Sequence, residues 1–375
     1  MRRGLRVALV HDWLTGMRGG ERCLEVFCEL FPDADLFTLL HVPGSVSPVI
    51  ERRRIVTSFL QRLPGSAVRY RYYLPLFPAA MRAFDFSGYD LVLSSSHAVA
   101  KAARRPRGAT HVCYCFTPMR YVWELYDDYF GARAPLAARL AMPPIAAALR
   151  RWDRRTSARV DRFVAISRFV AARIRRVWDR AADVVHPPVD VARFTVADDA
   201  RRDYYLVVGA LVPYKRVDLA VAAATRMQRR LLVVGSGPEA RRLAAMAGPT
   251  VEFLGWCPDA QVAELYARCR ALLFPALEDF GIVPLEAMAA GRPVVAFGAG
   301  GATETVVGLD GPADAAPTGV FFAEQRVEAL MDAMTTLERN EHRFEPKALR
   351  TRAEAFDRPL FRERIAAYIA EAVGC

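Results

Sequence analysis

The sequence predicts an α/β protein with two domains, each a parallel sheet covered by helices on both faces. The chain has 375 residues, which is enough for two hydrophobic cores. Short, almost continuously apolar segments alternate with helical segments, a pattern typical of parallel strands that are buried on both faces. The pair Pro187-Pro188 interrupts this alternation, because it suits neither a helix interior nor a central strand, and the alternation restarts after it.

The first half of the chain predicts a Rossmann-like domain over residues 1–186. Its strands are predicted over residues 6–12, 36–40, 90–96, 110–116, 162–167 and 182–185. Its helices are predicted after Gly19-Gly20, over residues 133–160, where Pro143-Pro144 breaks the pattern, and over 168–176. Residues 41–66 predict only loop and short helix.

The second half predicts another Rossmann-like domain over residues 187–358. Its strands are predicted over residues 204–208, 231–234, 251–254, 272–274, 294–297 and 320–322. An amphipathic helix over residues 359–375 is expected to pack back toward the first domain. We expect the two domains to face each other across a cleft, since ligands bind beyond the carboxyl ends of the strands in open α/β sheets.

Composition and charge exclude several classes of protein. The chain is 53% hydrophobic and 25% charged, as globular proteins are. We expect a cytoplasmic protein, because neither an apolar run of about 18 residues nor a signal peptide is present. The seven cysteines have no zinc spacing and indicate reduced thiols. The net charge of +11 suits an anionic membrane or a phosphorylated ligand, and no motif predicts nucleic-acid binding. Residues 69–78, rich in arginine and aromatic residues, either pack around a loop or face a membrane or acceptor.

Residues 278–287, which read EDFGIVPLEA, are the most informative stretch. They follow a predicted strand and lead into a helix through Gly281. The first amides of a helix are unpaired and its dipole is positive there, so this point is an anion site. Glu278 and Glu286 flank it and, being acids, suit sugar hydroxyls better than phosphate. The alternative is a plain connection with a solvated acidic loop.

Further candidates lie where other predicted strands end. Lys215 follows the strand over 204–208 and can neutralise a diphosphate, although a lone lysine there is commonly solvated. His97 follows the strand over 90–96, and its alternative is a structural histidine. Gly19 and Gly20 permit close approach of a ligand to the backbone, or simply form a tight turn.

Residues 235–240, GSGPEA, support a rival function because they match the dinucleotide pattern GxGxxA. That pattern predicts a nicotinamide or flavin enzyme. However, it does not follow the first strand of either domain, and Glu252 begins the next strand instead of ending it, where a ribose-binding acid belongs. Asp33 and Asp35 have no third ligand nearby, so we expect no metal site.

Taken together, these motifs resemble glycosyltransferase family 4, whose members are retaining enzymes of GT-B fold with nucleotide-sugar donors. The resemblance is carried by Glu278 and Glu286 with GRPVVA at 291–296, GGATETV at 300–306, VPYKRVD at 212–218 and HPPVD at 186–190. In the first half, HDWL at 11–14, GGE at 19–21 and SSHAVAK at 95–101 resemble a branch with mannosyltransferases of surface-polysaccharide assembly.

The resemblance implies a role for each candidate residue. Glu286 would hold the ribose and Glu278 the transferred sugar, with His97 near the reacting carbon. The Lys215 amine and the amides of Phe280, Gly281 and Ile282 would bind the diphosphate, which Gly19 and Gly20 approach from the first domain, and Gly237 would belong to the donor side. It also implies that a hexose is transferred to a lipid-linked or growing glycan, with GDP-mannose as the first choice of donor. No cofactor and no metal ion would be needed.

Two positions depart from the family pattern. Ala210 stands where the family often has arginine, so Lys215 acts alone or another arginine such as Arg216 replaces it. Phe116 stands where the branch usually has histidine. Both departures favour an alternative function, a non-catalytic GT-B relative that binds a nucleotide sugar or a partner transferase.

Overall fold

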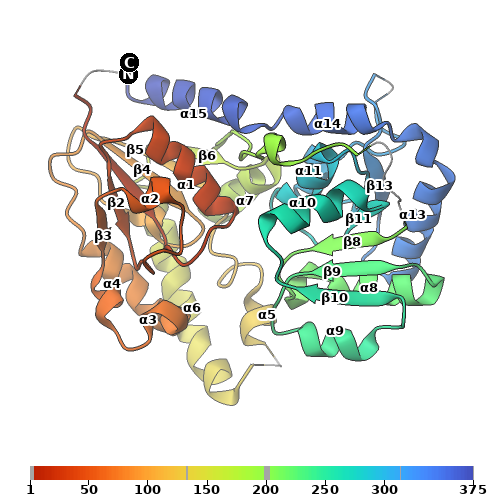
Figure 1. Cartoon of the computed structure of the whole chain (residues 1–375). Helices are drawn as coiled ribbons and strands as arrows, with labels where there is room; N and C mark the ends of the chain where they lie inside the picture. Colours follow the sequence, from red (N-terminus) through yellow and green to blue (C-terminus); the bar gives the residue numbers. More distant parts are fainter. Residues whose placement is uncertain (1–3, 132–133, 198–202, 313, 375) are drawn as a thin grey trace. The chain divides into compact units, whose positions relative to one another are not determined.

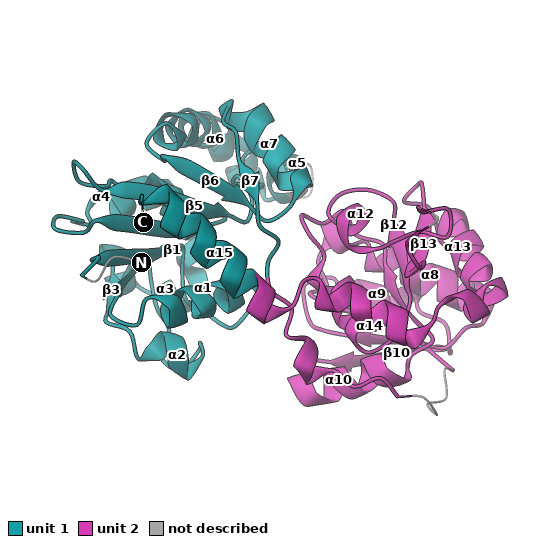
Figure 2. Cartoon of the chain, turned by 90° about the horizontal axis from the view of Figure 1, so that it is seen from above, with its two compact units in different colours: residues 1–187, 361–375 teal, residues 188–360 magenta. Residues whose placement is uncertain are grey.

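The structure, a computed structural model, describes residues 4–131, 134–197, 203–312 and 314–374 and forms two compact units (Figures 1 and 2). Unit 1 comprises residues 1–187 and 361–375, and unit 2 comprises residues 188–360. Each unit is built around its own parallel sheet, so the predicted fold class is confirmed.

The sheet of unit 1 has the strand order β3-β2-β1-β4-β5-β6-β7, with parallel pairing throughout its described strands. Its strands are β1 (Val7–His11), β2 (Asp35–Thr38), β3 (Ile55–Thr57), β4 (Leu91–Ser96), β5 (Thr110–Cys115), β6 (Arg162–Ala165) and β7 (Asp183–Val184). The direction of strand order reverses between β1 and β4. At such a switch point the loops after two neighbouring strands turn to opposite faces and leave a crevice for ligands.

Helices cover both faces of this sheet. They are α1 (Gly19–Leu30), α2 (Pro48–Glu51), α3 (Ser66–Arg69), α4 (Phe77–Arg82), α5 (Tyr126–Phe130), α6 (Leu136–Ser157), α7 (Arg168–Trp178) and the C-terminal α15 (Arg358–Ala372). Ala8 and Val10 of β1 belong to a core cluster with residues of α4 and α6. On the other face, Phe361 of α15 packs its ring against Phe27 of α1 and Tyr114 of β5.

The sheet of unit 2 has the order β10-β9-β8-β11-β12-β13, again parallel. Its strands are β8 (Tyr205–Val208), β9 (Leu231–Val234), β10 (Val251–Gly255), β11 (Ala271–Phe274), β12 (Val294–Phe297) and β13 (Gly319–Phe322). Its helices are α8 (Val217–Met227), α9 (Ala240–Met246), α10 (Asp259–Arg268), α11 (Ile282–Ala289), α12 (Ala302–Thr305), α13 (Val327–Arg339) and α14 (Pro346–Glu354). The switch point of this sheet lies between β8 and β11.

Two predictions about elements were wrong. Helix α6 continues through Pro143-Pro144 without a break. The prolines remove the hydrogen bonds to the carbonyls of Arg139 and Leu140, but this part of the helix is exposed, so water can satisfy those carbonyls. Strand β3 lies within residues 41–66, where only loop and short helix were expected. This strand has three residues and lies at the edge of the sheet, so it is too short to show an alternation of apolar and polar residues in the sequence.

Candidate functional site

The predicted site residues gather at the switch points of the two sheets. In unit 2, Lys215 follows β8 and Glu278 follows β11, the two strands that flank the reversal. In unit 1, His97 follows β4, and Asp12 directly follows β1. Open α/β sheets bind ligands at this place, so each unit carries candidate residues where its topology creates a binding crevice.

In unit 2, the structure brings Lys215 and Glu278 together as an ion pair between Nζ and Oε1. Both side chains are about four-fifths buried, with exposures of 21% and 17%. Lys215 ends the short 3₁₀ turn Pro213–Lys215. The arrangement places one cation and one carboxylate side by side, as needed for a ligand with a diphosphate next to hydroxyl groups.

The loop that carries Glu278 is fixed by close backbone packing. Gly281 has φ of 96°, a conformation that side chains other than glycine rarely adopt, and α11 begins at the next residue. The amide of Gly301 donates to the carbonyl of Glu278 at 2.8 Å. A Cβ atom on Gly301 would lie 2.2 Å from Cα of Phe280. These contacts hold the start of α11, whose first amides lack partners within the helix, against the end of β11.

Glu286 lies on α11 and receives a hydrogen bond from Tyr266 of α10, whose hydroxyl is 3.0 Å from Oε2. Burial, together with the Glu286 carboxylate, raises the pKa of Tyr266 well above its ordinary value. The phenol therefore stays protonated and donates, and it fixes the direction of the carboxylate. Tyr266 is a site residue that the sequence did not predict.

Gly237 belongs to a turn that packs against the Lys215 loop. The amide of Leu211 donates to the carbonyl of Ser236 at 2.9 Å, and the amide of Glu239 donates to the carbonyl of Leu211 at 3.0 Å. A Cβ on Gly237 would lie 2.3 Å from that Leu211 carbonyl, so the close approach requires glycine. The glycine pattern at 235–240 thus serves the packing of two loops.

The same loop contains Ala210, which stands where the family often has arginine, and Arg216, the candidate to replace that arginine. Ala210 is exposed. Arg216, which could replace the missing arginine, has its Nε and Nη2 atoms each 3.2 Å from the carboxylate of Asp218. Lys215 is therefore the cation that the structure pairs with Glu278.

In unit 1, Asp12 organises the turn that carries His97. Its Oδ2 accepts hydrogen bonds from the amides of His97 and Ala98 at 2.7 and 2.9 Å, and its Oδ1 accepts from Val99 and Ala100 at 2.6 and 2.7 Å. The ring atom Nδ1 of His97 lies 3.2 Å from Oδ2. The Asp12 side chain is completely buried, whereas that of His97 is 31% exposed.

Gly20 lies beside a second buried group, formed by His11, Glu21 and Ser95. Nδ1 of His11 lies 2.8 Å from Oγ of Ser95, and Nε2 lies 3.7 Å from Glu21. Burial favours the neutral form of Glu21, but the hydrogen bond and charge of His11 outweigh it and lower the pKa of this acid. Gly19 is the first residue of α1, and Gly20 faces the rings of Phe116 and His11.

Phe116 fills the place where a histidine was expected. Its ring centroid is 6.3 Å from those of His11 and His97 and 5.5 Å from that of Tyr114. It contributes apolar packing to the histidine-containing end of the sheet.

Two further observations bear on ligands. Within the described residues, no three histidine, cysteine or acidic side chains are grouped to hold a metal ion. A pocket of about 520 Å³ lies elsewhere in unit 2, between the loop after α12, strand β13 and helix α13. None of the predicted site residues lines this pocket.

Two protein-family models together match most of the chain. The family model described as Glycosyltransferase Family 4 matches residues 17–193, and the model described as Glycosyl transferases group 1 matches residues 190–356. The boundary between the two matches falls close to the boundary between units 1 and 2.

Individual relatives agree with these families. A GDP-mannose-dependent alpha-(1-6)-phosphatidylinositol monomannoside mannosyltransferase from Mycolicibacterium smegmatis is 30% identical over 347 residues, covering 76% of this chain and 86% of that protein. A GDP-mannose-dependent monoacylated alpha-(1-6)-phosphatidylinositol monomannoside mannosyltransferase from Corynebacterium glutamicum is 30% identical, covering 50% of this chain and 62% of that protein. Among solved structures, sucrose-phosphate synthase from Thermosynechococcus elongatus has a TM-score of 0.73 at 20% identity, covering 98% of each chain.

Proposed function

Because the chain belongs to glycosyltransferase family 4, we propose that it transfers a hexose from a nucleotide sugar to a lipid-linked or growing glycan, with mannose from GDP-mannose as the first choice. The observation that carries this proposal is the Lys215–Glu278 pair at the switch point of unit 2, beside the fixed start of α11. Two GDP-mannose-dependent relatives support the choice of donor.

In this proposal, unit 2 binds the donor through residues with distinct tasks. The Lys215 ammonium and the amides of Phe280, Gly281 and Ile282 bind the diphosphate, because the ammonium supplies positive charge and the start of a helix directs backbone N–H groups toward an anion. Glu278 accepts hydrogen bonds from hydroxyls of the transferred sugar. Glu286, aligned by Tyr266, accepts from the ribose hydroxyls.

The proposed reaction retains the anomeric configuration and needs no protein nucleophile. The acceptor oxygen forms a bond to the anomeric carbon on the face from which the diphosphate leaves. The bond from that carbon to the phosphate oxygen breaks, and the leaving phosphate oxygen takes the acceptor proton. Catalysis then consists mainly of electrostatic stabilisation of the departing diphosphate, a task for Lys215 and the helix amides without a metal ion.

Ala210 and Phe116 favour a second candidate, a relative that binds a nucleotide sugar or a partner transferase without turnover. The two candidates differ in nucleotide release. Purified protein is incubated with GDP-, UDP-, ADP- and dTDP-sugars and lipid-extract acceptors, and free nucleoside diphosphate is measured. We expect release with GDP-mannose and its loss in Glu278→Ala.

The matched control is Glu252→Ala, which removes an exposed carboxylate of unit 2 and should leave release unchanged. If none of the nucleotide sugars releases nucleotide and Glu278→Ala changes nothing, the transferase proposal is wrong. Binding of a nucleotide sugar without release would select the non-catalytic candidate.

A lipid-linked acceptor would be met at a membrane surface, and unit 1 offers a face for it. Four apolar side chains are largely exposed there: Val68 by 84%, Tyr72 by 83%, Leu136 by 67% and Leu140 by 71%. The segments that carry them, residues 59–82 and 134–149, contain no acidic residue. Tyr70 and Leu74 of the first segment and Ala146 and Leu149 of the second belong to one core cluster.

We infer that these segments contact anionic lipid peripherally, because exposed apolar side chains next to arginines suit the interface of such a membrane. Among the described helices, none combines the length and the apolar composition that a membrane span requires. Sedimentation with neutral and anionic vesicles tests the proposal. The double variant Leu136→Ser, Leu140→Ser should reduce binding to anionic vesicles, while Trp256→Ser, at an exposed site in unit 2, should not. Equal sedimentation of wild type and the double variant would contradict the proposal.

A further inference from the structure

We propose that Asp12 is a positioning residue for the transfer reaction. Its carboxylate fixes the turn over residues 97–100 and holds His97 in the tautomer that presents Nε2 as a hydrogen-bond acceptor. The inference rests on the proposed function, since it assigns Nε2 to a hydroxyl of the transferred sugar. It adds a residue that the sequence motifs gave no role.

The hydrogen bonds to Asp12 are arranged so that only an ionised carboxylate satisfies them. Each of its two oxygens accepts from two backbone amides, at distances from 2.6 to 2.9 Å. A protonated acid would direct its own hydrogen toward one of these amides. All four amides point their hydrogens at the carboxylate oxygens, so the negative charge of the carboxylate lies under the turn.

That charge determines the state of the His97 ring. Nδ1 lies 3.2 Å from Oδ2 of Asp12, which favours a proton on Nδ1. The ring is also held edge to face by Trp13, with centroids 4.4 Å apart and planes at 87°. A neutral imidazole protonated on Nδ1 has its lone pair on Nε2, so that atom can accept from a sugar hydroxyl.

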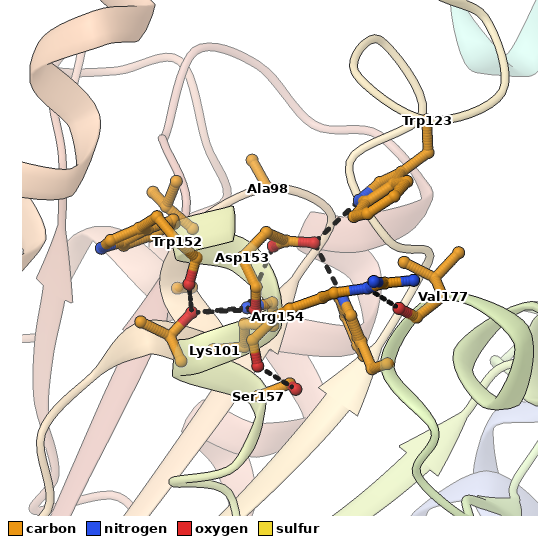
Figure 3. Close-up of polar contacts among 12 residues, drawn as sticks. Ala98, Lys101, Trp123, Trp152, Asp153, Arg154, Ser157 and Val177 are labelled. Carbon is orange, nitrogen blue, oxygen red and sulfur yellow. Dashed lines mark hydrogen bonds and ion pairs between the residues drawn. The ribbon is translucent and has the colours of Figure 1, made fainter. Parts of the chain in front are cut away.

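The far end of the same turn has an independent anchor (Figure 3). The Lys101 ammonium lies 3.0 Å from Oδ1 of Asp153 and donates to the Asp153 carbonyl and to Oγ1 of Thr156, both at 2.8 Å. Oδ2 of Asp153 accepts from the indoles of Trp123 and Trp178 at 2.9 and 2.6 Å. Lys101 and Asp153 are both fully buried. This pair stabilises the turn but does not touch His97, so it provides a structural control for Asp12.

The charged groups around His97 determine the pH dependence. Burial lowers the pKa of His97 below its ordinary value, Asp12 and Glu21 raise it, and His11 and Arg18 lower it. Activity requires neutral His97, so it falls as the pH drops through this pKa. Removing the negative charge of Asp12 lowers the pKa further and moves the acid limb of the pH profile to lower pH. A purely structural variant has no such effect.

The first measurement is the tautomer of His97 in the full chain, read from ¹⁵N chemical shifts of histidine-labelled protein. The chain has six histidines, and the spectrum of His97→Asn assigns the signal. We expect an unprotonated Nε2 at neutral pH. A proton on Nε2 would overturn the inference, whether or not Asp12→Asn folds.

The second measurement compares pH profiles of nucleotide release. Asp12→Asn should lower kcat by roughly tenfold or more, since a misdirected imidazole loses its function, and should move the acid limb to lower pH. Asp153→Asn should lower the melting temperature without moving the limb. In a His97→Asn background, Asp12→Asn should change kcat less than twofold, because both changes remove the same contact.

An unmoved limb in Asp12→Asn, or additive effects of the two substitutions, would overturn the inference. These failures differ from failure of the proposed function, which would appear as no nucleotide release by the wild type from any sugar. In that case the tautomer measurement still decides whether Asp12 sets the state of His97.

Discussion

At the scale of single residues, Lys215 is the side chain whose loss should affect turnover most specifically. It is paired with Glu278, and Ala210 leaves the family's usual arginine position without a cation. Lys215→Met should therefore lower kcat/KM for nucleotide release by about 3 kcal/mol in transition-state binding, or roughly 100-fold, by comparison with the loss of an oxyanion donor. Steady-state kinetics measures this effect. Lys347→Met, at an exposed lysine of α14, is the control, and a loss below threefold in Lys215→Met would contradict the prediction.

His111 should make the fold sensitive to acid. Burial lowers its pKa to about 3, and Oγ of Ser94 lies 2.8 Å from its Nε2. An unfolded histidine has a pKa of about 6.5. Between these values the unfolded chain binds a proton that the folded chain does not, so stability falls as the pH drops from 6.5 toward 3.

Removing this titration should therefore reduce the acid sensitivity. Between pH 7 and pH 5, the free energy of unfolding of the wild type should fall by about 2 kcal/mol more than that of His111→Gln. Urea unfolding at the two pH values measures the difference. His342→Gln, at an exposed histidine, should behave like the wild type. Equal pH dependence in wild type and His111→Gln would show that His111 binds a proton as readily in the folded chain as in the unfolded chain, which would contradict the prediction.

The partners of the candidate residues were harder to predict than the residues themselves. Lys215, His97 and Glu278 each follow a predicted strand, and strand ends can be located from apolar runs. Tyr266 lies in the last turn of an ordinary helix, and only the tertiary structure brings it to Glu286. Asp12 could have been noticed, because it is an acid directly after the first strand, but its amide partners lie more than 80 residues away in sequence.

At the scale of elements, the loop between β11 and α11 depends on the approach of α12. A Cβ on residue 301 would lie 2.2 Å from Cα and 2.5 Å from N of Phe280, so Gly301→Ala must displace the loop that carries Glu278. A shift of about 1 Å in a positioning element can cost roughly 100-fold in rate, and we expect a loss of this order in kcat/KM.

The neighbouring variant Gly298→Ala is the control, since its Cβ would come no closer than 3.3 Å to the Phe322 carbonyl. Both variants are assayed for nucleotide release and for thermal stability. Wild-type kinetics in Gly301→Ala would mean that the loop does not position Glu278.

Elements with strong apolar patterns were predictable, and those without were not. The central strands β1, β4, β8 and β11 are fully or mostly buried, so their apolar runs stand out from the polar segments around them. The edge strand β3 has only part-buried residues, and α6 tolerates two prolines because its first turns are exposed. Exposure weakens the relation between sequence pattern and local structure, since water can replace the missing contacts and hydrogen bonds.

At the scale of the whole molecule, both units repeat one topological principle. Each sheet reverses its strand order next to its first strand, and each places candidate residues after the two strands that flank the reversal. The alternation of strands and helices in the sequence predicts two parallel sheets, but it does not determine strand order. The strand order depends on which strands pair, and this pairing is determined by the packing of strands and helices that lie far apart in the sequence.

Helix α15 packs against unit 1, so the stability of unit 1 should depend on the residues of this helix. Phe361, Ile365 and Ile369 of α15 are fully buried, and the Tyr368 hydroxyl donates to Asp183 of β7 at 2.7 Å. Phe361→Ala removes a buried ring that contacts Phe27 and Tyr114, and it should destabilise unit 1 by about 3–5 kcal/mol.

The effect should remain within unit 1, because the partners of Phe361 lie there. Hydrogen exchange followed by mass spectrometry should show faster exchange in β1, β4 and β5 of Phe361→Ala, with unchanged exchange in β8, β11 and β12. Leu337→Ala, at a fully buried position of α13, should give the reverse pattern. If Phe361→Ala accelerates exchange equally in both units, they unfold as one cooperative body, and the division of the chain into two independently stabilised units is wrong.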